Sequence, residues 1–506
     1  MDGESKFSSI IVRNKRLVPI ALLISILFFQ ILWHLFLWVS NQNALSTDEY
    51  LRLYFSASWA KYPKLYIPGE FLPFYFYIYG TAVNFLGNIV WAGRIVTLLF
   101  SLLFSIYYYK LSSLIFNSRY AGILSLSLIL SSSLFMKIST VPLSEIGALA
   151  LIAMSLYYLF LWQTDLESDR KTNLMPLILF TLTLLFANGF RYECWIVTTF
   201  SLVFVIIVLI HTRISFAKTL TSASIVCLPF ALIILWLCMG KNVFGDPTKF
   251  IPDTQSSGSG LRLSNLLFYP KSMALYYPIV LLLYISIVFS IKGFFKDIKK
   301  TAILSTSLIF LAFLVYVSAR YKNNHMILPE RTLLFFVFFA ALVATSAFLD
   351  ITRRSLRFGK ALTTVMVTAI IVCFVISFAK FETLNRDPLP NPKRVGLYLK
   401  TMDKNGQLDK KDKILLEKTS EDWHVIYVES NLIGRIFFDR KSVLGKRMGA
   451  LPSQLQDIPT AELMDIINEN NISLLVFKSD SLKDYIRKNL KIKDEIKIGD
   501  YSIFNI

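Results

Sequence analysis

The sequence is poor in cysteine, and its first three quarters are poor in acidic residues. The four cysteines, at positions 194, 227, 238 and 373, have irregular spacing and lie in or beside apolar stretches. Because they form no CxxC pair, they exclude a disulfide framework of the secreted kind. Up to residue 381 there are 15 Asp and Glu residues against 32 Lys and Arg residues. A carboxylate beside an apolar stretch is costly, so each one here is a candidate functional group.

Apolar residues, in contrast, are abundant. They make up 55% of the 506 residues, and the mean hydropathy is +0.54. Apolar runs of about 18 residues or more, long enough to cross a bilayer, recur between residues 17 and 380. The first run, 17–40, is longer than a signal-peptide core and has no small-residue cleavage site after it, so we expect a retained span. The sequence therefore predicts an α-helical polytopic membrane protein in a lipid bilayer.

The apolar runs and the positions of Lys and Arg predict eleven spans, with the N-terminus in the cytoplasm. The loops KGFFKDIKK (292–300) and TRRSLRFGK (352–360) set this orientation, because dense basic loops prefer the cytoplasmic side. The predicted spans are 17–40, 92–112, 120–136, 144–162, 174–190, 194–211, 219–240, 272–291, 301–318, 332–349 and 361–379.

Residues 65–90 are also apolar enough to cross, but they carry Pro68, Gly69 and Pro73 near their start. A crossing here would turn both basic loops outward. We therefore expect an amphipathic or re-entrant helix at the outer surface, rich in Tyr and Phe as interfacial helices are. The alternative is a twelfth crossing.

The predicted topology gathers the candidate polar residues on the extracytoplasmic side. The surplus of Lys and Arg lies in short loops beside the spans, where orientation and anionic headgroups explain it. Nucleic acid is therefore not expected as a partner. The gathered residues are Asp48, Glu49, Glu145, Arg191, Glu193, Arg320, Lys322, His325, Glu330 and Arg331.

Residues 382–506 differ in composition, with 21 Lys and Arg against 19 Asp and Glu and only short apolar runs. This mixture is typical of a soluble domain, and an odd number of spans places it outside the cytoplasm. We expect two domains: a transmembrane domain, 1–381, and a soluble extracytoplasmic α/β domain, 382–506. The pattern predicts strands at 413–418, 424–429, 473–478 and 501–506, and helices near 392–402, 460–469 and 481–490.

Short motifs within residues 17–380 resemble those of the GT-C membrane glycosyltransferases. The Asp-Glu pair in STDEYLRLY (46–54) is followed by a Pro-containing amphipathic segment, by the stretch 91–130 that begins WAGRIV, and by a PLSE turn that ends at Glu145. The sequence is most similar to the group that contains bacterial lipid A aminoarabinose transferase and the protein O-mannosyltransferases. This resemblance implies a GT-C fold and a polyprenyl-phosphate sugar as donor.

Displacing a lipid phosphate from an anomeric carbon needs a carboxylate that deprotonates the acceptor hydroxyl and cations that stabilise the leaving phosphate. By the resemblance, Asp48 is the candidate base, and Glu49 beside it orients groups or holds an acceptor or a metal. The alternative is that one of the two only caps the helix that follows. Together with Glu145 they offer oxygen ligands for a divalent ion, but the sequence assigns no metal.

Glu145 matches the second acidic site of the family, so we interpret it as a catalytic candidate. The alternative is a carboxylate that only interacts with the dipole of the helix that it opens. Arg191 is a candidate ligand of the donor phosphate, because guanidinium matches phosphate oxygens. It could equally form only an ion pair with Glu193.

In PERTLLFF, Arg331 takes the place of the Arg in the family's Pro-Arg-Tyr stretch, and Thr332 stands where the Tyr would be. By the resemblance, Arg331 is the leading phosphate ligand. Lys322 and His325 in the preceding loop are further candidates, although a lone His in a loop is more often simply solvated. Lys322 and Arg320 would also attract an anionic lipid headgroup.

Together these features predict an integral-membrane glycosyltransferase of the plasma membrane. It would transfer a sugar, with inversion, from a polyprenyl-phosphate donor to a lipid, glycan or protein acceptor hydroxyl on the extracytoplasmic face. The sequence lacks the Trp-Trp-Asp signature of the oligosaccharyltransferase branch, which argues against transfer of a preassembled oligosaccharide to Asn. One alternative is a transporter or flippase of lipid-linked glycans, which should show broken helices and internal repeats. A polysaccharide polymerase or ligase is a third.

Overall fold

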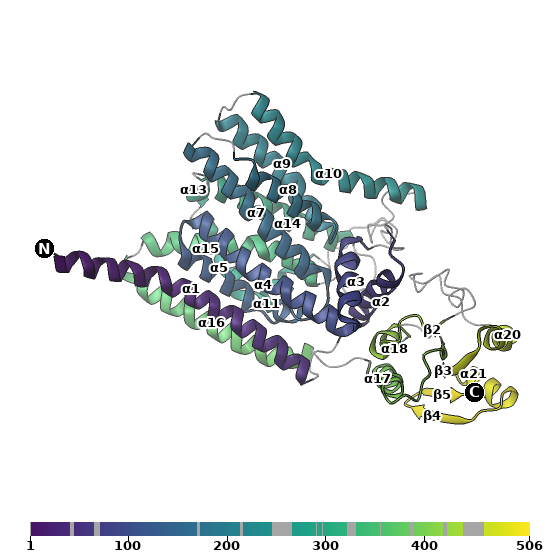
Figure 1. Cartoon of the computed structure of the whole chain (residues 1–506). Coiled ribbons are helices and arrows are strands. Elements are labelled where there is room, and N and C mark those ends of the chain that lie inside the picture. The colour runs from purple at the N-terminus through teal and green to yellow at the C-terminus, as the bar shows by residue number, and fades with distance from the viewer. Residues whose placement is uncertain are drawn as a thin grey trace. The chain divides into compact units, whose positions relative to one another are not determined.

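The computed structural model consists mainly of helices, with one small sheet near the C-terminus (Figure 1). The chain separates into two compact units. Unit 1 comprises Met1–Gln42, Thr97–Thr140 and Ser144–Leu384, and unit 2 comprises Asn43–Val96, Val141–Leu143 and Asn385–Ile506. The structure describes residues 2–40, 45–64, 71–169, 173–212, 216–244, 266–289, 291–295, 297–320, 330–354, 356–384, 389–417, 423–438 and 460–506.

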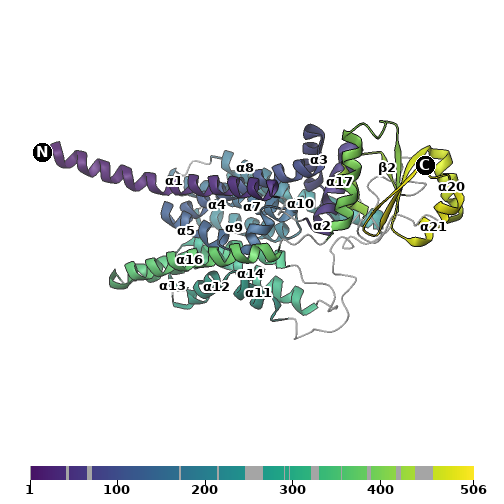
Figure 2. The ribbon, with the colours of Figure 1, turned by 90° about the horizontal axis from the view of Figure 1, so that it is seen from below.

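Unit 1 is a bundle of helices that are apolar over most of their surface, as membrane-embedded helices are. The rings of Phe29 on the first helix and Phe374 on the last helix of this unit lie 5.5 Å apart, so these two helices contact each other there. Figures 1 and 2 show the bundle from two directions. Its helices are α1 (Asp2–Val39), most of α4 (Ile89–Phe116), α5 (Arg119–Leu130), α6 (Ser133–Ile138), α7 (Ser144–Asp169), α8 (Met175–Asn188), α9 (Glu193–Thr212), α10 (Phe216–Phe244), α11 (Phe268–Tyr276), α12 (Pro278–Ile285), η2 (Ser286–Phe289), α13 (Ile291–Phe294), α14 (Ile298–Arg320), η3 (Glu330–Thr332), α15 (Leu333–Arg354) and α16 (Leu356–Leu384).

Helix α15 lies in the interior of unit 1, where it packs against α5, α12, α14 and α16. Its side chains from Leu333 to Phe348 are all buried. Polar contacts join it to its neighbours: the Tyr108 hydroxyl donates to the Phe338 carbonyl, and Ser125 donates to the Thr345 hydroxyl, both at 2.8 Å. Hydrogen bonds between helices are a usual means of association where water is absent. The short helix η3, which contains Arg331, directly precedes this buried helix.

Seven of the described helices are long and apolar enough to cross a membrane, and the bent pair α11 and α12 would make an eighth. Three shorter apolar helices are α5, α8 and the 361–377 part of α16. Each of the eleven predicted spans overlaps one of these helices, so the prediction of an α-helical polytopic membrane protein is confirmed. The number of crossings stays a prediction.

Residues 74–86 form a separate short helix, α3 (Phe74–Leu86), which ends at Gly87 with a positive φ of 62°. Thirteen residues of helix extend about 20 Å, less than the roughly 30 Å of a hydrocarbon core. Its length therefore favours the predicted surface or re-entrant helix over a full crossing. Residues 65–70 lie outside the described residues, so the path of the whole segment stays a prediction.

Unit 2 contains α2 (Thr47–Lys61), α3, the start of α4, and an α/β region formed by the C-terminal residues. The five strands pair in the order β2-β1-β3-β5-β4, parallel from β2 to β3 and antiparallel for the rest. These elements are α17 (Pro390–Lys404), β1 (Lys413–Leu416), α18 (Trp423–Ser430), β2 (Ile436–Phe437), α20 (Thr460–Asn470), β3 (Ile472–Phe477), α21 (Asp480–Asn489), β4 (Asp494–Ile498) and β5 (Tyr501–Asn505).

The sheet has helices on both faces, with α20 and α21 on one side and α17 on the other (Figures 1 and 2). Leu415, Leu475 and Phe504 from the strands pack with Leu463 and Ile486 from the helices in one buried core. The predicted α/β character of the C-terminal region is therefore confirmed. Unit 2 also includes residues 43–96, which the predicted boundary at 381 separated from it, and the two predicted domains stay a prediction.

One predicted strand in this region is wrong. His424–Glu429, predicted as a strand, lies within helix α18, whose eight side chains are all buried. A short apolar run that is buried all round does not distinguish a strand from a helix, and packing against α17 and α2 decides for the helix. The short strand β2 and the polar strand β4 were not predicted. The other three strands and all three helices are confirmed.

Candidate active site

The buried carboxylate of Glu145 is the centre of a charged cluster in unit 1. Glu145 lies in the first turn of α7 and is fully buried. Its Oε1 is 3.2 Å from Nη1 of Arg191 and 3.1 Å from Nε of Arg331. A buried charge persists only where opposite charges compensate it, and here two guanidinium groups do so. The helix-dipole interaction predicted as an alternative is compatible with this position, but it does not explain why two arginines converge.

Arg191 joins this carboxylate to a second one. Its guanidinium forms two hydrogen bonds to Glu193, at 3.0 Å from Nε and 2.5 Å from Nη2. The predicted alternative, an ion pair between Arg191 and Glu193, is therefore present, but Arg191 also contacts Glu145. Its side chain is 15% exposed, and its guanidinium carbon lies 6.0 Å from the ring centre of Phe335 on α15.

A close helix contact places Arg191 next to Glu145. Gly147 faces the ring of Phe190, and a Cβ at this glycine would lie only 2.6 Å from the ring. Phe190 belongs to the turn between α8 and α9 that carries Arg191. Because Gly147 has no side chain, this turn can approach the first turns of α7. The cluster thus depends on a glycine that sequence reasoning did not single out.

Arg331 is the most exposed member of the cluster, with 28% of its side chain accessible. It lies in η3, immediately before α15. Guanidinium groups bind phosphate through paired hydrogen bonds. Buried carboxylates hold both arginines in place, and Arg331 is the more accessible of the two. That they bind the donor phosphate stays a prediction.

The acidic dyad lies in unit 2, and its two members have different environments. Ser46 and Glu49 form a capping box at the start of α2, and the Glu49 carboxylate also accepts a hydrogen bond from the Ser46 hydroxyl. Glu49 is 3% exposed. The predicted capping role therefore falls on Glu49. Asp48 is not part of the capping box and remains 29% exposed.

Arg52, one turn after Asp48, is a charged residue that sequence reasoning missed. Its Nε is 3.4 Å from Oδ1 of Asp48, and its side chain is 5% exposed. The guanidinium carbon lies 4.7 Å from the ring centre of Phe71 and 5.7 Å from that of Tyr75. The spacing of four residues in a helix was the only sequence signal for this pair.

Tyr75, whose ring lies near Arg52, is itself held by a hydrogen bond. Its hydroxyl donates a hydrogen bond to the carbonyl of Pro142 at 2.6 Å. Burial raises the pKa of Tyr75 well above its usual value, with the neighbouring Tyr79 as a second cause. The hydroxyl therefore stays protonated at physiological pH and remains a donor.

The structure thus brings Glu145, Arg191 and Arg331 together, and it places Asp48 and Glu49 side by side on α2. That these two groups face one cavity stays a prediction. Lys322 and His325 lie outside the described residues, as do the side chains of Arg320 and Glu330. Within the described part of the chain, no three His, Cys, Asp or Glu side chains are close enough to hold a metal.

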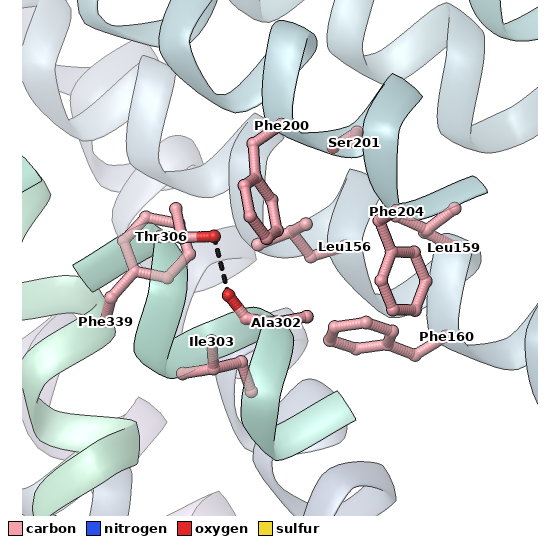
Figure 3. Close-up of a pocket in the computed structure, with 10 residues that line it drawn as sticks. All are labelled: Leu156, Leu159, Phe160, Phe200, Ser201, Phe204, Ala302, Ile303, Thr306 and Phe339. Atoms are coloured by element: carbon pink, nitrogen blue, oxygen red, sulfur yellow. Dashed lines mark hydrogen bonds between the residues drawn. The ribbon is translucent and has the colours of Figure 1, made fainter. Parts of the chain in front are cut away.

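An apolar pocket lies deeper in the same helices, between α7, α9, α14 and α15 (Figure 3). Leu156 follows Glu145 by eleven residues, or about 16 Å along α7. The pocket contains no charged side chain, and the Thr306 hydroxyl donates to the Ala302 carbonyl at 2.8 Å. Its lining is mostly apolar and supplies no acid, base or phosphate ligand. Its lining residues are Leu156, Leu159, Phe160, Phe200, Ser201, Phe204, Ala302, Ile303, Thr306 and Phe339.

Neither a protein-family model nor a curated protein matches the sequence. Solved structures do match the fold. The structure of ArnT from Cupriavidus metallidurans bound to undecaprenyl phosphate aligns with a TM-score of 0.64 and 9% sequence identity, covering 96% of this chain and 97% of ArnT. The apo state of the same protein aligns with a TM-score of 0.62 over the same shares of both chains.

The oligosaccharyltransferase of Archaeoglobus fulgidus in the apo form aligns with a TM-score of 0.53 and 14% identity, over 90% of this chain and 69% of that one. Its complex with an inhibitory peptide and a dolichol-phosphate, in which the protein is named AglB, aligns with a TM-score of 0.50 and 12% identity. At these identities the likeness concerns the fold, and the fold predicted from the motifs is confirmed. This protein has an ArnT-like GT-C fold.

Proposed function

We propose that this protein is a membrane glycosyltransferase that uses a polyprenyl-phosphate-linked sugar as donor. The observation that carries the proposal is the convergence of Arg191 and Arg331 on the buried Glu145, at the ends of helices in a GT-C fold. The similar structures of ArnT and AglB contain undecaprenyl phosphate and a dolichol-phosphate, respectively. A pair of arginines with one accessible member is suited to the phosphate of such a lipid.

The reaction is a single displacement with inversion. Asp48 accepts the proton of the acceptor hydroxyl, and the hydroxyl oxygen attacks the anomeric carbon as the bond from that carbon to the phosphate oxygen breaks. The lipid leaves as polyprenyl phosphate, and Arg331 stabilises the charge that develops on its oxygens. Glu145, which is also paired with Arg191, holds Arg331 in place.

The donor delivers one hexose or pentose, and the acceptor hydroxyl belongs to a lipid, a glycan or a protein. The protein lies in the plasma membrane as a multi-pass protein, with the active site and the C-terminal α/β region on the extracytoplasmic side. The basic loops at 292–300 and 352–360 support this orientation, because they would then face the cytoplasm.

Replacement of the proposed base tests this function. Asp48→Asn keeps the size of the side chain but removes the carboxylate, so we expect transfer to fall by about 10²-fold to 10⁴-fold. The measurement uses purified protein, a panel of radiolabelled polyprenyl-phosphate sugars and extracted envelope acceptors. Donor binding and folding should be retained. Asp494→Asn, at an exposed position of β4, is the matched control and should keep full activity. Full activity of the Asp48→Asn variant would refute the proposed role of this residue.

A further inference from the structure

Helix α2 presents two different faces within unit 2. Asp48 and Arg52 are four residues apart and share the face that carries the proposed base. Tyr50 and Tyr54 are also four residues apart, and each lies two positions further along the helix, or about 200° around its axis. The face with the two tyrosines is therefore roughly opposite to the face with Asp48.

The tyrosine face packs against residues from the C-terminal part of the chain. The ring of Tyr54 makes edge-to-face contacts with Trp423, Tyr427 and Phe438, at centroid distances of 4.7, 5.0 and 6.3 Å. Edge-to-face contacts favour one relative orientation of the rings, in addition to burying apolar surface. Helix α18 is thus fixed against α2 in a defined geometry.

A buried hydrogen bond lies beside this aromatic group. The Tyr50 hydroxyl donates to Oε1 of Glu429 at 2.5 Å, and the two residues are 1% and 7% exposed. Arg94 on α4 and Lys400 on α17 both interact electrostatically with Glu429. A buried carboxylate needs such compensation. Glu429, on α18, thus interacts with residues of α2, α4 and α17.

Asn431, two positions after Glu429, forms hydrogen bonds with the segment between α3 and α4. The side chain of Asn431 donates to the Gly87 carbonyl at 2.8 Å and accepts from the Ile89 amide at 2.9 Å. It thereby connects the residue after the end of α3 with the first residue of α4. Residues 423–431 consequently contact both α2, which carries the proposed base, and the start of α4, which carries Arg94.

From this arrangement we infer that Glu429 is a positioning residue for glycosyl transfer: through Tyr50 it holds α2, and with it Asp48, in the geometry that the reaction needs. This inference rests on the proposed function. Displacement of a catalytic group by about 1 Å can lower a rate 10²-fold, even when the altered residue is remote from the substrate. The C-terminal α/β region thus contributes to catalysis although Glu429 touches neither donor nor acceptor.

The test compares Glu429→Ala, Glu429→Gln and Tyr50→Phe in the full-length protein. We expect Glu429→Ala and Tyr50→Phe to lower kcat by about 10-fold to 100-fold, with the KM for the donor changed by less than about threefold. Glu429→Gln keeps an oxygen that can accept from Tyr50, so it should retain more activity than Glu429→Ala. The donor is the radiolabelled polyprenyl-phosphate sugar on which the wild-type protein is active.

A matched control is another carboxylate of the same α/β region, one that joins the end of β1 to the residues after β3. Glu417 accepts hydrogen bonds from the amides of Lys478 and Ser479, at 2.6 and 2.9 Å. Glu417→Ala should lower the melting temperature but leave kcat unchanged. Hydrogen exchange provides a readout without donor: amides of Thr47–Lys61 should exchange about tenfold faster in Glu429→Ala, and not in the control.

Wild-type kcat in a folded Tyr50→Phe or Glu429→Ala protein would overturn the inference. If Glu429→Ala does not fold, Tyr50→Phe alone decides, because it removes only the hydroxyl. The outcomes also separate the two proposals. Full activity of Asp48→Asn would contradict the proposed function, whereas an inactive Asp48→Asn protein together with fully active Tyr50→Phe would contradict only the role of Glu429.

Discussion

At the residue scale, the linked side chains of Glu145, Arg191 and Arg331 differ in burial as their proposed roles require. Glu145 is inaccessible and can act only through its neighbours. Arg191 is shared between two carboxylates, whereas Arg331 has the largest exposed fraction. An incoming phosphate can therefore reach Arg331 most easily. In the proposed mechanism Arg331 binds the phosphate, and Glu145, which is also paired with Arg191, holds Arg331 in position.

Arg331→Ala should weaken donor binding. A hydrogen bond to a charged group contributes about 1.5–3 kcal/mol, so we expect the KM for the donor to rise roughly 10-fold to 150-fold. Arg331→Lys should recover only part of this, because an ammonium group cannot bind phosphate through a planar fork. Inhibition by undecaprenyl phosphate gives a second measurement and should weaken in parallel. Arg353→Ala, exposed near the other end of α15, is the control. An unchanged KM and unchanged inhibition would contradict the assignment.

The individual residues of the site were predictable to different degrees. Glu145, Arg191 and Arg331 were identified from short motifs and from their position at the ends of apolar runs, and the structure brings them together. Arg52 was visible only as a residue one turn from Asp48. Glu429 gave no signal, because 379 positions separate it from Tyr50 and only tertiary structure joins them.

At the element scale, α2 carries the proposed base, and its start is defined by a capping box rather than by its weakly apolar sequence. Ser46 and Glu49 provide this cap. Capping fixes the first turn, where Asp48 lies. The two adjacent carboxylates therefore have different environments: Glu49 caps the helix, and Asp48, which is partly exposed, stays the proposed base.

Glu49→Ala should destabilise the first turn of α2 by about 1 kcal/mol, because it removes half of the capping box. We expect a lower midpoint of thermal denaturation in detergent and a partial loss of activity. Glu49→Gln retains an acceptor for the Ser46 amide and should behave nearly as wild type in both measurements. A Glu49→Gln protein with normal thermal stability but no transfer would show that Glu49 takes part in the reaction itself.

Elements were predictable where periodicity or length was decisive. Apolar runs of about 18 residues or more predicted helices of the membrane domain, and the strand predicted at 473–478, observed at Ile472–Phe477, was recognised from a short apolar run. Helix α18 was mistaken for a strand because its sequence, rich in Val, Ile and Tyr, has the composition of one. Its neighbours α17 and α2 bury all of its faces, and this contact cannot be read from local sequence.

At the scale of the whole molecule, apolar helices make the protein a polytopic membrane protein, and the fold is that of the GT-C structures. Composition alone indicated the membrane, while only the resemblance of short motifs indicated the type of fold. The joining of residues 43–96 with the C-terminal region in one compact unit was not predicted. It depends on side-chain contacts such as that between Tyr50 and Glu429.

The most direct test of the proposed function is the stoichiometry of the reaction in detergent, where no membrane separates two compartments. Purified protein receives the radiolabelled polyprenyl-phosphate sugar and the acceptor, and both products are quantified over time. A transferase should release one polyprenyl phosphate for each glycosylated acceptor, and the product should have the opposite anomeric configuration to the donor. Absence of product in detergent, together with movement of the intact lipid-linked sugar across reconstituted vesicles, would contradict this account and identify a transporter.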